Sequence, residues 1–146
     1  HLGLSPYYRG SGTNIWPLIN DEPEMIGATF MHLDSGIDTG EIIHQIRPII
    51  NVTDSFHQLS NRFLISSFQT YSKIAERNLK NGLELPLPTN NIKNCKRLIY
   101  KKSDFSRESV IKLYDNFKNG MLNEYLINQK KEIKNVPILE QAWLKV

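Results

Sequence analysis

One long stretch of helical periodicity limits the folds open to this chain. A side-chain oxygen of Thr53 or Asp54 can cap its first turn, and Gly82 followed by Pro86 ends it. We therefore predict a helix over residues 54–81 with one apolar face packed against a core. Apolar residues recur along that face at spacings of three or four, which is the α-helical period; they are Leu64, Phe68, Tyr71, Ala75 and Leu79. Phe56, Leu59 and Phe63 extend the same apolar side towards the start of the helix.

Two β-prone runs precede this helix. Residues 27–33 and 41–50 are the runs, and the second is rich in β-branched side chains. Pro48 places the second run at a sheet edge or marks where its character changes. Residues 34–40 between them form a turn-rich cluster. Two strands joined by such a loop can pair as neighbours, and together with the helix they predict an α/β fold.

The second half of the chain predicts further helices. A polar link over 89–96 leads to an amphipathic segment that Ser106 can cap and Gly120 ends. A shorter helix is predicted over 122–129, and residues 136–139 read as an extended arm. The buried stripe expected on the helix after Ser106 is Val110, Leu113, Tyr114 and Phe117.

Charge is divided unevenly along the chain. The net charge is +3, but residues 1–72 carry three basic and seven acidic residues, whereas residues 73–146 carry fifteen basic and eight acidic ones. A basic segment can bind nucleic acid, yet these lysines are scattered among Glu and Asn, which favours a solvated basic face. No run of about 18 apolar residues predicts a membrane span. The single Cys95 excludes an intramolecular disulfide, and we expect a cytoplasmic protein.

Four histidines raise the question of a metal site. His32, His44 and His57 are separated by twelve and thirteen residues, and no Cys or His lies at short ligand spacing. His32 and His44 fall inside the β-prone runs, where a histidine bonded to neighbouring groups is common. We therefore predict no metal site. Chemistry is expected in the first forty residues, which hold six of the eight glycines and so read as loops.

Two motifs in this glycine-rich part resemble a known enzyme family. The first reads HLGLSPYYRG over residues 1–10, and the second reads DSGIDTG over residues 34–40. In order and spacing they resemble the formyltransferases that use N10-formyltetrahydrofolate. That family includes the glycinamide ribonucleotide, methionyl-tRNA and sugar N-formyltransferases. The resemblance runs from His1 to about Pro88.

The resemblance implies that His1 and Asp38 are catalytic residues. In the family, a substrate amine attacks the formyl carbon and forms a tetrahedral oxyanion. Hydrogen-bond donors or an imidazolium stabilise such an oxyanion. A histidine can also take up the proton of the amine, and a carboxylate beside it raises its basicity and fixes its tautomer. The loop formed by Asp34, Ser35, Gly36 and Ile37 is implied to lie over the pterin of the folate.

The resemblance also implies where the acceptor binds. Arg9, Gly10, Asn14 and Trp16 are the expected substrate-binding residues, although Arg9 could instead fix its loop by donating to backbone carbonyls. The Asn14–Trp16 element resembles the enzymes that formylate amino sugars on nucleotide carriers. The expected acceptor is therefore the amino group of a nucleotide-linked amino sugar. A methionyl-tRNA formyltransferase is the second reading, because of the basic tail, and the purine-pathway enzyme is the third.

The expected domains follow from the extent of the resemblance. Residues 1–88 are expected to be the C-terminal part of a Rossmann-like catalytic domain, with two or three strands and a long helix. Residues 89–146 are expected to be a helical extension. The family's catalytic asparagine lies two residues before the histidine, ahead of His1. Without the opening half, the sheet would expose an edge and an apolar face, which favours a homodimer or aggregation. The alternative to an enzyme is an inactive fragment that serves only in binding or oligomerisation.

Overall fold

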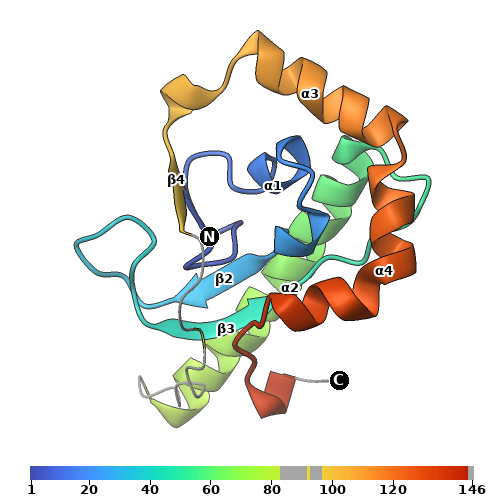
Figure 1. Cartoon of the computed structure of the whole chain (residues 1–146). Coiled ribbons are helices and arrows are strands. Elements are labelled where there is room, and N and C mark those ends of the chain that lie inside the picture. Colours follow the sequence, from blue (N-terminus) through green and yellow to red (C-terminus); the bar gives the residue numbers. More distant parts are fainter. Residues whose placement is uncertain (83–91, 93–96, 145–146) are drawn as a thin grey trace.

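The computed structural model of the chain describes residues 1–82, 92 and 97–144 (Figure 1). The two β-prone runs form strands β2 (Ala28–Met31) and β3 (Ile42–Ile46), which pair antiparallel around the intervening loop as predicted. β3 is shorter than its run and ends before Pro48, which has no N–H for a strand ladder. The loop between the strands projects from the body of the molecule at the left of Figure 1.

A second pair of strands connects the two halves of the chain. β1 (Tyr8–Gly10) runs parallel to β4 (Leu98–Tyr100), with Tyr8 opposite Leu98. The Leu98 N–H donates to the carbonyl of Tyr7 at 2.8 Å, and the Ser11 N–H donates to the carbonyl of Tyr100 at 2.9 Å. The sequence analysis predicted no strand at either place, because each is only three residues long and its partner is far away in sequence.

The long helix α2 (Phe56–Asn81) begins two residues later than predicted. Ser55 is its cap: the Ser55 hydroxyl accepts from the Gln58 N–H, and the Gln58 side chain accepts from the Ser55 N–H. The prediction that Thr53 or Asp54 caps the helix was wrong, since the Asp54 carboxylate instead pairs with Arg62. The end at Gly82 is confirmed, and its φ of +87° is one that glycine adopts without strain.

The predicted buried face of α2 is confirmed at its start, where Phe56, Leu59 and Phe63 pack on the core, but was wrong for most of its later residues. Phe68 is 64% exposed and Tyr71 is 59% exposed, whereas Phe63 is only 4% exposed. The helix carries two largely apolar stripes about a third of a turn apart, so periodicity alone does not decide which one packs. The stripe facing the rest of the chain consists of Leu59, Phe63, Ser67 and Ile74, and the exposed one includes Leu64, Phe68, Tyr71 and Leu79.

Two helices follow β4. α3 (Arg107–Lys118) begins after its predicted cap Ser106 and packs on the short helix α1 (Trp16–Ile19). It buries Leu113, whereas Tyr114 is 60% exposed, contrary to prediction. α4 (Met121–Asn135) is twice as long as the helix predicted there. No helix in the part of the chain that the structure describes is long and apolar enough to cross a membrane.

The extended arm after α4 returns to the strands, as Figure 1 shows. The Gln45 N–H donates to the carbonyl of Leu139 at 2.7 Å, and the Tyr7 hydroxyl donates to the carbonyl of Pro137 at 2.7 Å. His44, expected to have a neighbouring partner, accepts a 2.9 Å bond from the Gln141 N–H. The arm therefore packs onto β3 and onto Tyr7 of the first motif. The predicted link over 89–96 lies outside the described residues apart from Ile92.

Candidate active site

His1 is held at the site by its own backbone. Its carbonyl accepts from the Thr29 N–H at 2.9 Å, and its amino group donates to the Thr29 carbonyl at 3.2 Å, so His1 lies beside β2. The ring Nε2 lies 3.1 Å from the carbonyl of Tyr8, and Nδ1 lies 3.3 Å from Oδ1 of Asp38. A carbonyl oxygen only accepts, so Nε2 carries a proton in this arrangement. Because Nδ1 faces a carboxylate, the same geometry suits the doubly protonated imidazolium.

Asp38 connects the two sequence motifs. Its Oδ2 accepts a 2.8 Å bond from the Gly10 N–H, and its main-chain carbonyl accepts a 3.2 Å bond from the Ser5 hydroxyl. The φ of Asp38 is +52°, a left-handed conformation that Asp and Asn adopt more readily than most residues. Gly10 has a φ of +92°, and a Cβ there would collide with the carbonyl of Tyr100. The site therefore depends on a glycine and an aspartate at these two positions.

The loop before Asp38 is shaped by Asp34. Oδ1 of Asp34 accepts from the Gly36 N–H at 2.9 Å and from the Thr39 hydroxyl at 2.8 Å. These bonds are local, so the Asp34 carboxylate builds the loop. Ser35 and Gly36 are exposed at the tip. Ile37 is 62% exposed, and the loop thus presents an apolar side chain to solvent beside the His1–Asp38 contact.

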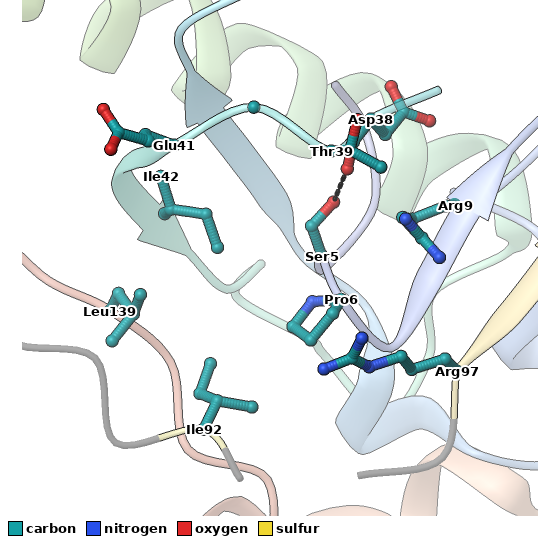
Figure 2. Close-up of a pocket in the computed structure, with 11 residues that line it drawn as sticks. Ser5, Pro6, Arg9, Asp38, Thr39, Glu41, Ile42, Ile92, Arg97 and Leu139 are labelled. Atoms are coloured by element: carbon teal, nitrogen blue, oxygen red, sulfur yellow. Dashed lines mark hydrogen bonds between the residues drawn. The ribbon is translucent and has the colours of Figure 1, made fainter. Parts of the chain in front are cut away.

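A cavity of about 550 Å³ opens beside this contact (Figure 2). Ser5, Pro6 and Arg9 of the first motif line it together with Asp38 of the second. The remaining wall comes from Glu41 and Ile42, from Arg97 ahead of β4, and from Ile92 and Leu139. The cavity thus joins both motifs to segments of the second half of the chain. Among the described residues, no group of three side chains could hold a metal ion.

Of the four predicted substrate-binding residues, Arg9 lines the cavity, whereas Gly10, Asn14 and Trp16 do not. Trp16 is only 6% exposed, and its ring stacks on Tyr100 with the centroids 4.0 Å apart. Asn14 is half-buried beside Leu59 and Phe63, away from the cavity. Gly10 contributes its N–H to Asp38. The structure brings together His1, Arg9, Gly10 and Asp38, whereas Asn14 and Trp16 lie outside this group and their role in binding stays a prediction.

Tyr8, the first residue of β1, is buried and supports the site from within the core. The Tyr8 hydroxyl donates to the Glu22 carboxylate, and Asn20 Nδ2 donates to the hydroxyls of Tyr8 and Tyr100, each at 2.8 Å. Burial is the main cause that raises the pKa of Tyr8, the Glu22 carboxylate adds to it, and the Asn20 bond only partly opposes it. Tyr8 therefore stays protonated and joins β1 to β4 instead of taking part in proton transfer.

Sequence reasoning missed three residues that build the site. Ser5 donates to the Asp38 carbonyl. Gln45, which is fully buried, donates to the carbonyl of Ser5 at 2.7 Å and to the hydroxyl of Thr29 at 2.9 Å. Gln45 could have been noticed in the sequence, because it is a polar side chain inside an apolar strand run. Arg97 could not, since only the pairing of β4 with β1 brings it to the cavity.

Comparison with known proteins identifies related sequences. Residues 1–74 match the family described as formyl transferase. The methionyl-tRNA formyltransferase of Thermodesulfovibrio yellowstonii is 33% identical over 88 residues, which are 60% of this chain and 28% of that protein. The methionyl-tRNA formyltransferase of Cyanothece sp. is 29% identical over 105 residues, 72% of this chain and 31% of that protein. The chain thus spans less than a third of the length of these two relatives.

Three solved structures are similar to this chain. The N-formyltransferase of Helicobacter canadensis, in complex with folinic acid and dTDP-3-aminofucose, is 32% identical with a TM-score of 0.58, covering 73% of this chain and 38% of that one. WlaRD, a sugar 3N-formyl transferase in the presence of dTDP and 5-N-formyl-THF, is 28% identical with a TM-score of 0.57, covering 73% and 37%. PseJ of Anoxybacillus kamchatkensis, at 21% identity and a TM-score of 0.60, covers 91% and 61% and shares the fold.

Proposed function

The chain belongs to the formyl transferase family, and from this membership we propose that its protein transfers a formyl group from N10-formyltetrahydrofolate to a primary amine. The observation that carries the proposal is the contact between His1 and Asp38, 3.3 Å from Nδ1 to Oδ1. These are the two residues that the motifs single out, and they come from loops 37 positions apart. The fold class predicted from the motifs, α/β with a Rossmann-like relationship to formyltransferases, agrees with the solved relatives.

His1 and Asp38 divide the chemistry between them. The amine attacks the formyl carbon, and the formyl oxygen becomes an oxyanion. The C=O bond then re-forms as the bond from the formyl carbon to the donor nitrogen breaks, and the proton that the amine loses is taken up by that nitrogen. With Nε2 and Nδ1 both facing acceptors, the imidazolium supplies positive charge to that oxyanion. Asp38 holds the ring in place and stabilises its charge. The Gly10 N–H, which donates to Asp38, keeps the carboxylate in the required orientation.

The loop of Asp34, Ser35, Gly36 and Ile37 is proposed to contact the formyl donor. The donor supplies the activated formyl group and the leaving nitrogen of the reaction. Ile37 fits this role, because its exposed apolar side chain suits a flat ring system. The bonds from Gly36 and Thr39 to Asp34 keep the loop in one shape before the donor arrives. The folate compounds named with the solved relatives support this choice of donor.

For the acceptor, we propose the amino group of a nucleotide-linked amino sugar. The cavity beside Asp38, about 550 Å³, is in the range of small-molecule sites. The H. canadensis relative, 32% identical, is described with dTDP-3-aminofucose. A methionyl-tRNA acceptor is the second candidate, because curated relatives of the chain carry that activity in their names.

A direct formyl-transfer assay tests the proposal. The protein, in the longest form that its gene encodes, is incubated with N10-formyltetrahydrofolate and either dTDP-linked or UDP-linked amino sugars, and the formamide product is measured by mass spectrometry. Parallel reactions contain charged initiator methionyl-tRNA. We expect product with at least one sugar nucleotide and none with the tRNA.

Two results would count against the proposal in different ways. Formylation of the tRNA alone would show that methionyl-tRNA, the second candidate, is the acceptor. An absence of formyl product with every amine, from a folded protein, would leave the chain as a binding or oligomerisation module. A glycine amide reaction serves as the control for uncatalysed transfer from the donor.

A further inference from the structure

Two arginine side chains line the cavity without any partner in the described part of the chain. Neither Arg9 nor Arg97 donates a hydrogen bond or forms an ion pair with another described residue, and the Nε of Arg9 is buried with nothing to accept from it. Buried donors are nearly always satisfied in folded proteins, so an unsatisfied one at a cavity calls for an acceptor from outside the chain. The alternative in which Arg9 fixes its own loop through backbone carbonyls has no such bond to support it among these residues.

The fold brings the two arginines together from distant positions. Arg9 is the central residue of β1, and Arg97 immediately precedes β4, which pairs in parallel with β1. Figure 2 shows both side chains directed at the space around Pro6, Arg9 from the strand and Arg97 from below it. Each guanidinium can donate two parallel hydrogen bonds, and two of them around one space suit a tetrahedral anion with several oxygens.

Neither carboxylate of the cavity wall forms an ion pair with the two arginines. Asp38 is engaged on both oxygens, Oδ1 near His1 and Oδ2 with the Gly10 N–H. Glu41 is the other carboxylate of the wall, and in Figure 2 its oxygens point away from the arginines. Both guanidinium groups are therefore left to donate to a group that enters the cavity, and a positive group in a cleft attracts anions.

We propose that Arg9 and Arg97 bind a phosphate of the acceptor, specifically the diphosphate of a nucleotide-linked substrate. This inference deepens the proposed function and rests on it. The donor is assigned to the other side of Asp38, since Asp34, Ser35, Gly36 and Ile37 do not line the cavity. With the diphosphate on the two arginines, the attached sugar extends toward Asp38. The arginines thus select acceptors that carry a phosphate near the amine.

Calorimetric titration of the protein with thymidine diphosphate tests the site directly. The variants are Arg97→Ala and Arg9→Lys, and the matched control is Arg107→Ala, which removes an exposed arginine at the start of α3. Hydrogen bonds to charged groups predict a Kd for thymidine diphosphate that is about 10- to 100-fold higher in each of the two cavity variants. The control should stay within twofold, and so should the binding of 5-formyltetrahydrofolate to all variants.

Several outcomes would overturn the inference. One is an unchanged Kd for thymidine diphosphate in a folded Arg97→Ala protein. Another is a loss of 5-formyltetrahydrofolate binding instead, which would assign the arginines to carboxylates of the donor. Weakened tRNA binding with intact thymidine diphosphate binding would also contradict it. Thymidine without phosphates should bind alike to wild type and variants, and a difference there would reveal a general collapse of the cavity.

The kinetic readout separates this inference from the proposed function. In the formyl-transfer assay, Arg97→Ala should raise KM for the sugar nucleotide about 10- to 100-fold and leave kcat within about threefold. A fall in kcat alone would overturn the role in binding. If no formyl transfer occurs with any amine while thymidine diphosphate still binds through both arginines, the proposed function fails and the phosphate site remains.

Discussion

Asp38 combines an unusual backbone with two occupied carboxylate oxygens. Its φ of +52° and its bonds from Gly10 and toward His1 leave few residues that could replace it. Asn keeps the left-handed conformation and one acceptor oxygen, but it loses the negative charge that faces the ring. Substitution by Asn therefore separates the electrostatic role of Asp38 from its structural one.

Asp38→Asn should lower kcat for formyl transfer by about 10²- to 10⁴-fold, because the imidazolium loses its counter-charge. The melting temperature should change little, since the residue is partly exposed and Asn retains a bond from the Gly10 N–H. Steady-state kinetics and thermal unfolding measure the two effects. Asp115→Asn, at an exposed position of α3, is the control and should change neither. More than a tenth of wild-type kcat in Asp38→Asn would argue against the catalytic assignment.

At the level of elements, the two apolar stripes of α2 differ in how far their side chains are exposed to solvent. Phe63 is 4% exposed and belongs to the main core, whereas Phe68, five positions later, is 64% exposed. Truncation of a buried phenylalanine leaves a cavity, but truncation of an exposed one removes contacts mainly with water. The pair thus compares equal chemistry on two faces of one helix.

Phe63→Ala should lower the free energy of unfolding by about 3–5 kcal/mol, and Phe68→Ala by less than about 0.5 kcal/mol. Urea unfolding followed by circular dichroism measures both values. Equal destabilisation by the two substitutions, or a larger effect of Phe68→Ala, would restore the helix face predicted from the sequence and contradict the packing described above.

The turn that precedes α2 depends on an ion pair. Burial raises the pKa of Asp54, but the bonds from Arg62 and from Asn51 outweigh it and hold the pKa below its ordinary value. A carboxyl with a depressed pKa stabilises the fold above its unfolded pKa, near 4, and this contribution is lost as the pH falls through the folded value. The turn is therefore sensitive to acid.

Urea unfolding at pH 7 and pH 3 tests this linkage. At pH 7 the wild type should be more stable than Asp54→Asn, and the difference should shrink as the pH drops to 3, because below about 4 the unfolded chain takes up a proton at Asp54 that the pairing with Arg62 opposes in the fold. Asp115→Asn should track the wild type at both values. A stability gap between wild type and Asp54→Asn that is the same at pH 3 as at pH 7 would rule out the ion pair as its source.

The elements also mark where sequence reasoning succeeds and where it stops. The existence of α2, its end at Gly82 and the antiparallel pairing of β2 with β3 could be predicted, because each depends on local spacing and turn chemistry. The buried face of the later turns of α2 could not, since both stripes are largely apolar. β1 and β4 were missed, because three residues give no periodicity and their pairing is decided by tertiary packing. His1 and Asp38 were found through a motif, whereas Arg97 has no motif.

At the scale of the whole molecule, Gln45 of β3 connects three other segments of the chain. Its amide donates to Ser5 and Thr29, its Oε1 accepts from the Leu139 N–H at 2.9 Å, and its own N–H bonds to the Leu139 carbonyl. The first motif, β2 and the C-terminal arm thus meet at one fully buried side chain. Removal of the amide would take away the partner of two backbone groups, the Ser5 carbonyl and the Leu139 N–H.

Gln45→Leu should therefore lower the free energy of unfolding by about 2–4 kcal/mol, since each stranded buried donor or acceptor costs 1–3 kcal/mol. The Leu139 amide proton should also exchange with solvent faster than in the wild type, because it loses its acceptor. Hydrogen exchange by NMR and urea unfolding measure the two effects. Gln69→Leu, at an exposed position of α2, is the control. Unchanged exchange at Leu139 would show that the arm is held by other contacts.

The parallel pairing of β1 with β4 has a consequence for the order of assembly during synthesis. Tyr8 and Leu98 lie ninety positions apart, so the ribosome releases the His1–Asp38 loops long before the strand that completes the cavity wall. Contacts between residues so distant form late, because closing the long intervening segment costs entropy before any contact repays it. A nascent chain would thus contain both motifs but would not bind an anion at the proposed site until the segment with Arg97 and β4 had emerged and paired with β1.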